Sequence, residues 1–104
     1  MQASEFQDAT RLFAVYPEEN EFSYLTLGLA AEAGEVADKA AKYFRGDKGL
    51  DAKEFSKELG DCLWFISQLC NRFGWKLEDV MQENIDKLSD RKARDKLKGS
   101  GDDR

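Results

Sequence analysis

Two pairs of acidic residues carry the clearest chemistry in the sequence. Glu32 and Glu35 form one pair, and Glu58 and Asp61 form the other. The residues of each pair are three positions apart, so on a helix their side chains are neighbours, and two antiparallel helices would gather all four carboxylates. Like charges this close need a cation, and oxygen ligands suit Mg²⁺ or Mn²⁺. The alternative is a solvated acidic face on which Glu35 pairs with Lys39.

Three polar residues near the end of the chain form a second group. Asn84, Lys87 and Arg91 lie in a segment whose apolar residues recur at helical spacing. At about 100° per residue, Asn84 falls within the apolar stripe, while Lys87 and Arg91 share one side of it. A buried amide needs a partner, so Asn84 either bonds a neighbouring helix end or faces a ligand cavity. The two cations predict an anionic group bound beside the carboxylates, and the alternative for them is a solvated flank.

The composition excludes several kinds of chemistry. The chain has no histidine, which rules out Ser-His and Cys-His nucleophile pairs and any zinc site with a histidine ligand. Proton transfer is left to carboxylates, lysine or metal-bound water. With 16 basic and 21 acidic residues the net charge is −5, which argues against a protein that coats nucleic acid or an anionic membrane.

Helical periodicity runs through nearly the whole chain, and no segment alternates like a strand. Ser4 and Gln7 have the spacing of a capping box, which predicts a short helix that ends before Pro17. Longer helices are expected over about residues 24 to 44, 52 to 73 and 77 to 97. We therefore predict one all-α domain over about residues 1 to 98, a compact four-helix bundle-like fold whose two long antiparallel helices carry the acidic pairs. A flexible tail is expected over about residues 99 to 104.

The third predicted helix has a clear apolar line, with Trp64 on the opposite side. The residues of this line are Phe55, Leu59, Cys62, Ile66, Leu69 and Phe73. A tryptophan that faces away from its own helix's core line favours packing on another helix or on a second subunit over plain exposure. Together with the modest core of a chain of 104 residues, this predicts a homodimer or homotetramer.

The cysteines and the beginning of the chain predict a cytoplasmic protein. Cys62 and Cys70 would lie about 12 Å apart along a helix, which is too far for a disulfide and indicates reduced thiols. The first residues lack the features of a signal peptide, and no apolar run is long enough to cross a membrane.

The order and spacing of these motifs resemble a known family, the MazG-like superfamily of all-α nucleotide pyrophosphohydrolases. The resemblance rests on Glu32-Ala33-Gly34-Glu35, Glu58-Leu59-Gly60-Asp61, and Asn84-Ile85-Asp86-Lys87-Leu88 followed by Arg91. The matching motifs lie on the predicted helices, and the resemblance covers roughly residues 20 to 95. The closing Gly99-Ser100-Gly101-Asp102-Asp103-Arg104 is also similar to the tail of short single-domain bacterial and phage members.

The resemblance implies a function and a role for each group. Such a protein would convert a nucleoside or deoxynucleoside triphosphate into the monophosphate and pyrophosphate with Mg²⁺, or with Mn²⁺ in its place. The four carboxylates would hold the metal ions, with Glu35 orienting or deprotonating the attacking water. Asn84, Lys87 and Arg91 would contact the triphosphate or the sugar. Phe65 lies where members often place an aromatic ring near the base, and a core position fits it equally well.

Two other functions stay open at this point. A non-catalytic helical interaction module would keep the helices but would have no reason to place Asn84, Lys87 and Arg91 together. A related metal-dependent phosphohydrolase, acting on phosphoribosyl-ATP or on a nucleotide-sugar diphosphate, would share the carboxylates. The tail is open as well: its glycines and Arg104 either close over bound phosphates as an anion-binding nest or form a solvated end.

Overall fold

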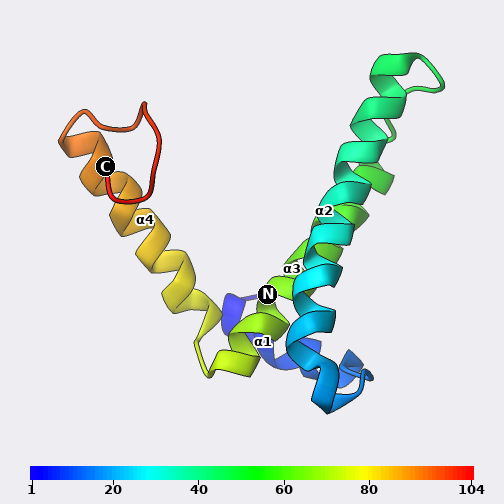
Figure 1. The fold of residues 1–104 in the computed structure, drawn as a ribbon, viewed down its shortest axis with the longest axis horizontal. Coiled ribbons are helices and arrows are strands. Elements are labelled where there is room, and N and C mark those ends of the chain that lie inside the picture. The colour runs from blue at the N-terminus through cyan, green and yellow to red at the C-terminus, as the bar shows by residue number, and fades with distance from the viewer.

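The structure, a computed structural model, describes all 104 residues, and all of its regular secondary structure is helical. Its α-helices are Ala3–Thr10 (α1), Glu21–Arg45 (α2), Ala52–Phe73 (α3) and Leu77–Ala93 (α4). Two short 3₁₀ helices, Arg11–Phe13 (η1) and Glu18–Asn20 (η2), join α1 to α2. The predicted all-α class with two long helices is confirmed (Figure 1). None of these helices combines the length and apolar character that a membrane crossing requires.

The ends of the long helices follow from local backbone chemistry. Asp51 caps α3, because its side chain accepts hydrogen bonds from the backbone N–H groups of Lys53 and Glu54. Gly46 ends α2 and Gly74 ends α3, with φ values of 88° and 72° that glycine adopts without strain. These turns define α2 and α3 as a hairpin and allow α4 to start in a new direction.

Two other helix ends differ from the prediction. The capping residue of α1 is Gln2 rather than Ser4, and the backbone N–H of Gln2 donates a hydrogen bond to Oε1 of Glu5. The last helix ends at Ala93 rather than near Leu97. Asp95 has a left-handed φ of 55°, which turns the chain out of the helix and back along it.

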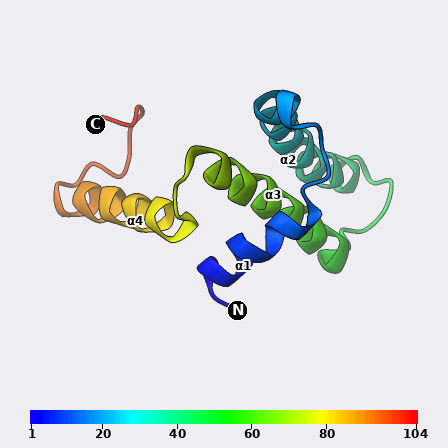
Figure 2. The same ribbon diagram turned by 90° about the horizontal axis from the view of Figure 1, so that it is seen from below.

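The antiparallel pair of α2 and α3 is the most extensive helix contact in the chain (Figures 1 and 2). Leu25 of α2 is fully buried. The ring of Phe65 from α3 lies so close to Gly28 of α2 that a Cβ atom at Gly28 would overlap it. The absence of a side chain at this position therefore lets the two helices approach each other closely.

A buried polar junction attaches α1 to the end of α3 and the start of α4. The Nε2 group of Gln7 donates to Oδ1 of Asn71 and to the carbonyl oxygen of Trp75, both at 2.8 Å. Oε1 of Gln7 accepts from the backbone N–H of Leu77 at 2.7 Å. Because these buried amide groups are hydrogen-bonded, they fix the position of α1 rather than destabilise the core.

Trp64 packs within its own chain. Its ring meets those of Tyr16 and Phe65 edge-on, with centroids 6.4 and 5.0 Å away, and its Nε1–H donates to the carbonyl oxygen of Thr10 at 3.2 Å. Of the two alternatives for this tryptophan, packing against another element of the same chain is the one observed. Trp64 therefore provides no argument for a second subunit.

The last helix leaves the other helices and extends as a separate arm, so the chain has a V shape (Figure 1). The main helix contact of α4 is with α1, near the bend of the V. The radius of gyration is 16.5 Å, compared with about 13 Å for a compact chain of this length.

The open arm determines which residues are buried. Phe65, Ser67, Gln68 and Cys70 are the buried residues of α3, whereas Leu59 and Phe73 from the predicted line are 47% and 48% exposed. The predicted core position of Asn84 is wrong, because Asn84 is exposed. The apolar residues of the arm are exposed with it: Val80, Met81, Ile85 and Leu88. Helical periodicity identifies an apolar face, but not whether another helix of the same chain covers it.

Candidate metal and nucleotide site

Three carboxylates from two helices meet between α2 and α3. Glu32 belongs to α2, and Glu58 and Asp61 belong to successive turns of α3. One oxygen atom of each lies within 4.8 Å of the others. Glu32 and Glu58 are half-buried and Asp61 is exposed, so the cluster is accessible from solvent. The antiparallel hairpin thus brings together three of the four carboxylates that the motif spacing singles out.

The electrostatics of the cluster are those of crowded like charges. Burial raises the pKa of Glu32 above its usual value, and a hydrogen bond with Glu58 and the charges of Asp61, Glu58 and Glu35 raise it further. Lys39 compensates part of the negative charge, since its Nζ lies 3.6 Å from Oε1 of Glu58. A set of carboxylate oxygens whose charges oppose one another fits a hard divalent cation such as Mg²⁺ or Mn²⁺.

Glu35 lies one turn beyond Glu32 on α2 and is exposed. It lies outside the group of three mutually close oxygens and borders a cavity at the hairpin end of α2 and α3. Lys39, the expected partner of Glu35 on a solvated acidic face, pairs with Glu58 instead. The roles of Glu35 as a fourth ligand and as the residue that acts on water stay predictions.

An aromatic group lies next to the carboxylates. Phe65, one turn after Asp61, is buried, and its ring centroid is 5.7 Å from that of Tyr24. Tyr24 in turn stacks on Tyr16 at 4.9 Å. Phe65 is therefore part of the core, and its contact with a base stays a prediction. The acidic motifs do not predict a role for either tyrosine. Tyr24 precedes Glu32 by about two helical turns, however, which places both residues on one side of α2.

The predicted substrate-binding residues lie on the separate arm. Asn84, Lys87 and Arg91 belong to α4, which diverges from α2 and α3, so a single chain does not bring them to the carboxylates (Figure 1). Lys87 and Arg91 do converge on one anionic group, but this group is Asp102 of the chain's own tail. Contact of these residues with a nucleotide stays a prediction.

Comparison with known proteins agrees with the assignment of the motifs. A family model, described as the MazG nucleotide pyrophosphohydrolase domain, matches residues 20–94, which include both acidic motifs and α4. The chain is also similar to the Gene 37 protein of Mycobacterium phage L5, with 38% identity over an alignment of 109 positions that covers 95% of this chain and 96% of that protein. No solved structure gives a match. Since the family model spans most of the chain, this protein belongs to the MazG nucleotide pyrophosphohydrolase family.

Proposed function

We propose that this protein is a Mg²⁺-dependent enzyme that converts a nucleoside or deoxynucleoside triphosphate into the monophosphate and pyrophosphate. The observation that carries the proposal is the cluster of Glu32, Glu58 and Asp61 within the segment that matches the family. A helical module that served only to contact other proteins would gain nothing from three carboxylates whose charges oppose one another.

The three clustered carboxylates are the proposed holders of the metal ion. Glu32 provides oxygen ligands from α2, and Glu58 and Asp61 provide them from α3. The two helices are fixed relative to each other by their close contact at Gly28, which keeps the ligands in place before substrate arrives. A bound Mg²⁺ supplies charge neutralisation and orientation of the phosphate oxygens.

Glu35 is the residue we assign to the attacking water. Its exposed carboxylate lies beside the cluster on the same helix as Glu32, where a water molecule can approach from solvent. Glu35 accepts a proton while the water oxygen forms a bond to the α-phosphorus. The bond from the α-phosphorus to the bridging oxygen of the β-phosphate breaks, and pyrophosphate leaves. Tyr24, whose exposed ring packs against the buried ring of Phe65, offers an aromatic surface for the base at the side of this site.

A homodimer, or a homotetramer built from such dimers, is part of the proposal. One chain leaves two apolar surfaces uncovered: the stripe on α4, and a groove on α2 and α3 that Trp75 and Val80 border at the start of α4. The groove is lined by Phe22, Leu29, Ile66, Leu69, Phe73 and their neighbours. Exposed apolar patches of this kind mark interaction surfaces, and α4 of a second copy matches the groove in chemistry. Such packing would also carry Asn84, Lys87 and Arg91 toward the carboxylates of the other copy.

A cytoplasmic location completes the proposal. Cys62 and Cys70 are both free thiols, as expected in a reducing compartment. The net charge of −5 gives no reason to expect a nucleic acid partner.

The test is a product screen with the purified protein. All common nucleoside and deoxynucleoside triphosphates are incubated with Mg²⁺, and pyrophosphate and orthophosphate are measured separately. The proposal predicts release of pyrophosphate and monophosphate that stops when the metal is chelated. Orthophosphate as the primary product, or no turnover of any triphosphate, contradicts it. Phosphoribosyl-ATP and nucleotide-sugar diphosphates in the same screen identify a related hydrolase.

A further inference from the structure

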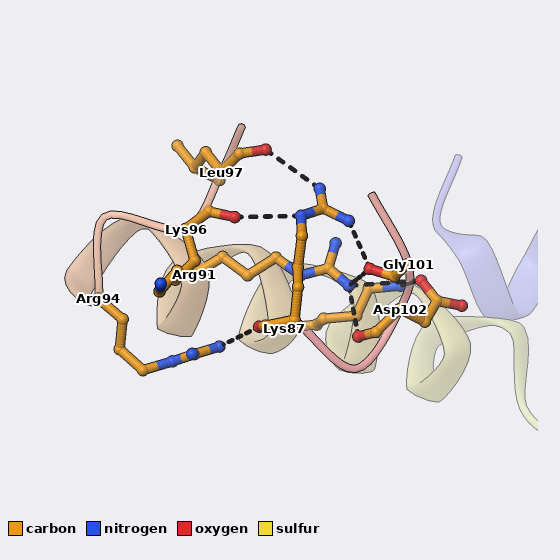
Figure 3. A network of polar contacts seen from close by, with 8 residues as sticks. Lys87, Arg91, Arg94, Lys96, Leu97, Gly101 and Asp102 are labelled. Carbon is orange, nitrogen blue, oxygen red and sulfur yellow. Dashed lines mark hydrogen bonds and ion pairs between the residues drawn. The ribbon is translucent and has the colours of Figure 1, made fainter. Parts of the chain in front are cut away.

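The eleven residues that follow Ala93, the last residue of α4, fold back along the helix and close on themselves (Figure 3). The guanidinium group of Arg104 donates hydrogen bonds to the carbonyl oxygens of Lys96, Leu97 and Gly101. Arg94 donates to the carbonyl oxygen of Arg104 at 2.7 Å. The tail is thus closed at its end and held against α4.

Asp102 of this loop bridges Lys87 and Arg91, the two basic residues for which the family resemblance implies contact with the triphosphate or the sugar. Its Oδ1 atom lies 3.1 Å from Nζ of Lys87 and 3.4 Å from an Nη atom of Arg91 (Figure 3). An oxyanion held between an ammonium and a guanidinium group is also the arrangement in which these side chains bind a phosphate oxygen. The carboxylate therefore occupies the binding groups that a phosphate would use.

The contacts of Asp102 differ in how easily they are broken. Its side chain is 83% exposed, so its ion pair with Lys87 is screened by solvent and weak. Arg91, by contrast, is only 5% exposed and also donates to the carbonyl oxygens of Gly101 and Asp102, the latter at 2.6 Å. The carboxylate can consequently leave while the backbone of the loop stays attached to Arg91.

We propose that Asp102 is a built-in competitor for phosphate at Lys87 and Arg91, and that the polyphosphate group of a substrate displaces it. This inference rests on the proposed function for the identity of the substrate. The competition between Asp102 and a phosphate anion can, however, be measured without catalysis. A polyphosphate carries several negative charges against the single charge of the carboxylate, so it gains more from the two cations. Removal of the Asp102 charge should then strengthen binding of the anion.

The matched pair of variants is Asp102→Asn and Asp103→Asn. Both remove one negative charge from an exposed position of the same loop, but only Asp102 bridges Lys87 and Arg91. Calorimetric titration with inorganic tripolyphosphate, at low salt and without metal, compares their affinities with that of the wild type. We expect Asp102→Asn to bind at least about fivefold more tightly than Asp103→Asn, which is a modest effect for removal of one nearby charge. Lys87→Met in the Asp102→Asn background should remove the gain.

Equal or weaker binding by Asp102→Asn, or no tripolyphosphate binding by any of the proteins, overturns the inference. Steady-state kinetics with the best nucleotide separate this result from failure of the proposed function. A competitor predicts a lower KM in Asp102→Asn with little change in kcat. If no variant hydrolyses any nucleotide, the proposed function fails, while the tripolyphosphate titration still decides whether Asp102 competes with phosphate.

Discussion

The α2–α3 pair and the α4 arm carry charged groups of opposite sign, and they differ in how far those charges are neutralised. Between α2 and α3, three carboxylates lie together with Lys39 as a partial counter-charge. On the arm, Lys87 and Arg91 are neutralised by a carboxylate that the tail supplies. The acidic group thus retains an excess of negative charge that suits a cation, whereas the basic group already contains a stand-in for an anion.

The two regions also differ in how they bury apolar surface. The aromatic rings around Phe65 pack inside the α1–α3 unit, while the apolar stripe of α4 is exposed. One chain therefore keeps the carboxylate cluster of α2 and α3 apart from the basic residues of α4, which under the proposed function are the two halves of a nucleotide site. A metal ion and a second copy of the chain are the components that would join them under the proposed function.

The largest expected effect comes from removing one carboxylate of the cluster. Glu32→Gln should reduce Mg²⁺-dependent pyrophosphate release at least about 100-fold, because a metal ligand and its charge are lost. The melting temperature without metal should stay the same or rise, since one of several crowded like charges is gone. Glu83→Gln, on the exposed surface of α4, is the matched control and should retain activity. Unfolding of Glu32→Gln would show that the cluster is structural.

The same variant should change how stability depends on pH. The pKa of Glu32 is raised above the usual 4.5 in the folded chain, so the folded state holds this proton more tightly than the unfolded state does. Its contribution to stability is present below about pH 4.5 and is lost as the pH rises through the raised folded-state pKa. Denaturant titrations over this window should therefore show the metal-free wild type losing stability relative to Glu32→Gln. A constant difference between the two proteins contradicts this account of the cluster.

Assembly should depend on the exposed stripe of the arm rather than on Trp64. Ile85→Glu should raise the dimer dissociation constant at least about tenfold, because it places a charge in an apolar contact. Glu83→Lys changes the charge on the opposite side of α4 and should leave assembly intact. Sedimentation equilibrium measures both. A wild-type protein with only the single-chain mass of 11.8 kDa at micromolar concentration contradicts the proposed dimer.

The smallest effects concern packing inside the α2–α3 pair. Gly28→Ala should lower the free energy of unfolding by about 1–3 kcal/mol, since its Cβ would overlap the ring of Phe65. Gly34→Ala, on the same helix with nothing within 4 Å of the added atom, should raise it by up to about 1 kcal/mol. Chemical denaturation distinguishes the two. Equal effects would mean that the close approach at Gly28 does not matter.

The parts predicted correctly from sequence depend on local chemistry. Periodicity and the glycines at the helix ends predict the helices. The spacing of Glu32, Glu58 and Asp61 predicts a cluster of carboxylates, because a short hairpin leaves two helices few ways to pack. The sequence pattern predicts a buried Asn84, but α4 forms no core within one chain and Asn84 is exposed. Its stripe position is correct, but a stripe does not specify the surface that covers it.

The tail shows the same limit. The glycines and charges of residues 99–104 indicate an anion-binding loop or a solvated end, and neither pattern specifies a contact with Lys87 and Arg91. That contact depends on the left-handed turn at Asp95, which sends the chain back along α4. A single residue in this conformation carries little signal in a sequence, because aspartate is also common in ordinary turns.

Calorimetric titration of the purified protein with Mn²⁺ tests the metal site directly, with Glu58→Gln and Glu83→Gln as the paired variants. Glu58 belongs to the cluster, whereas Glu83 is an exposed glutamate of the arm, so both variants lose the same charge. We expect saturable binding that weakens at least about tenfold in Glu58→Gln and is unchanged in Glu83→Gln. Equal binding by all three proteins, or no saturable binding by the wild type, would contradict a metal site at Glu32, Glu58 and Asp61.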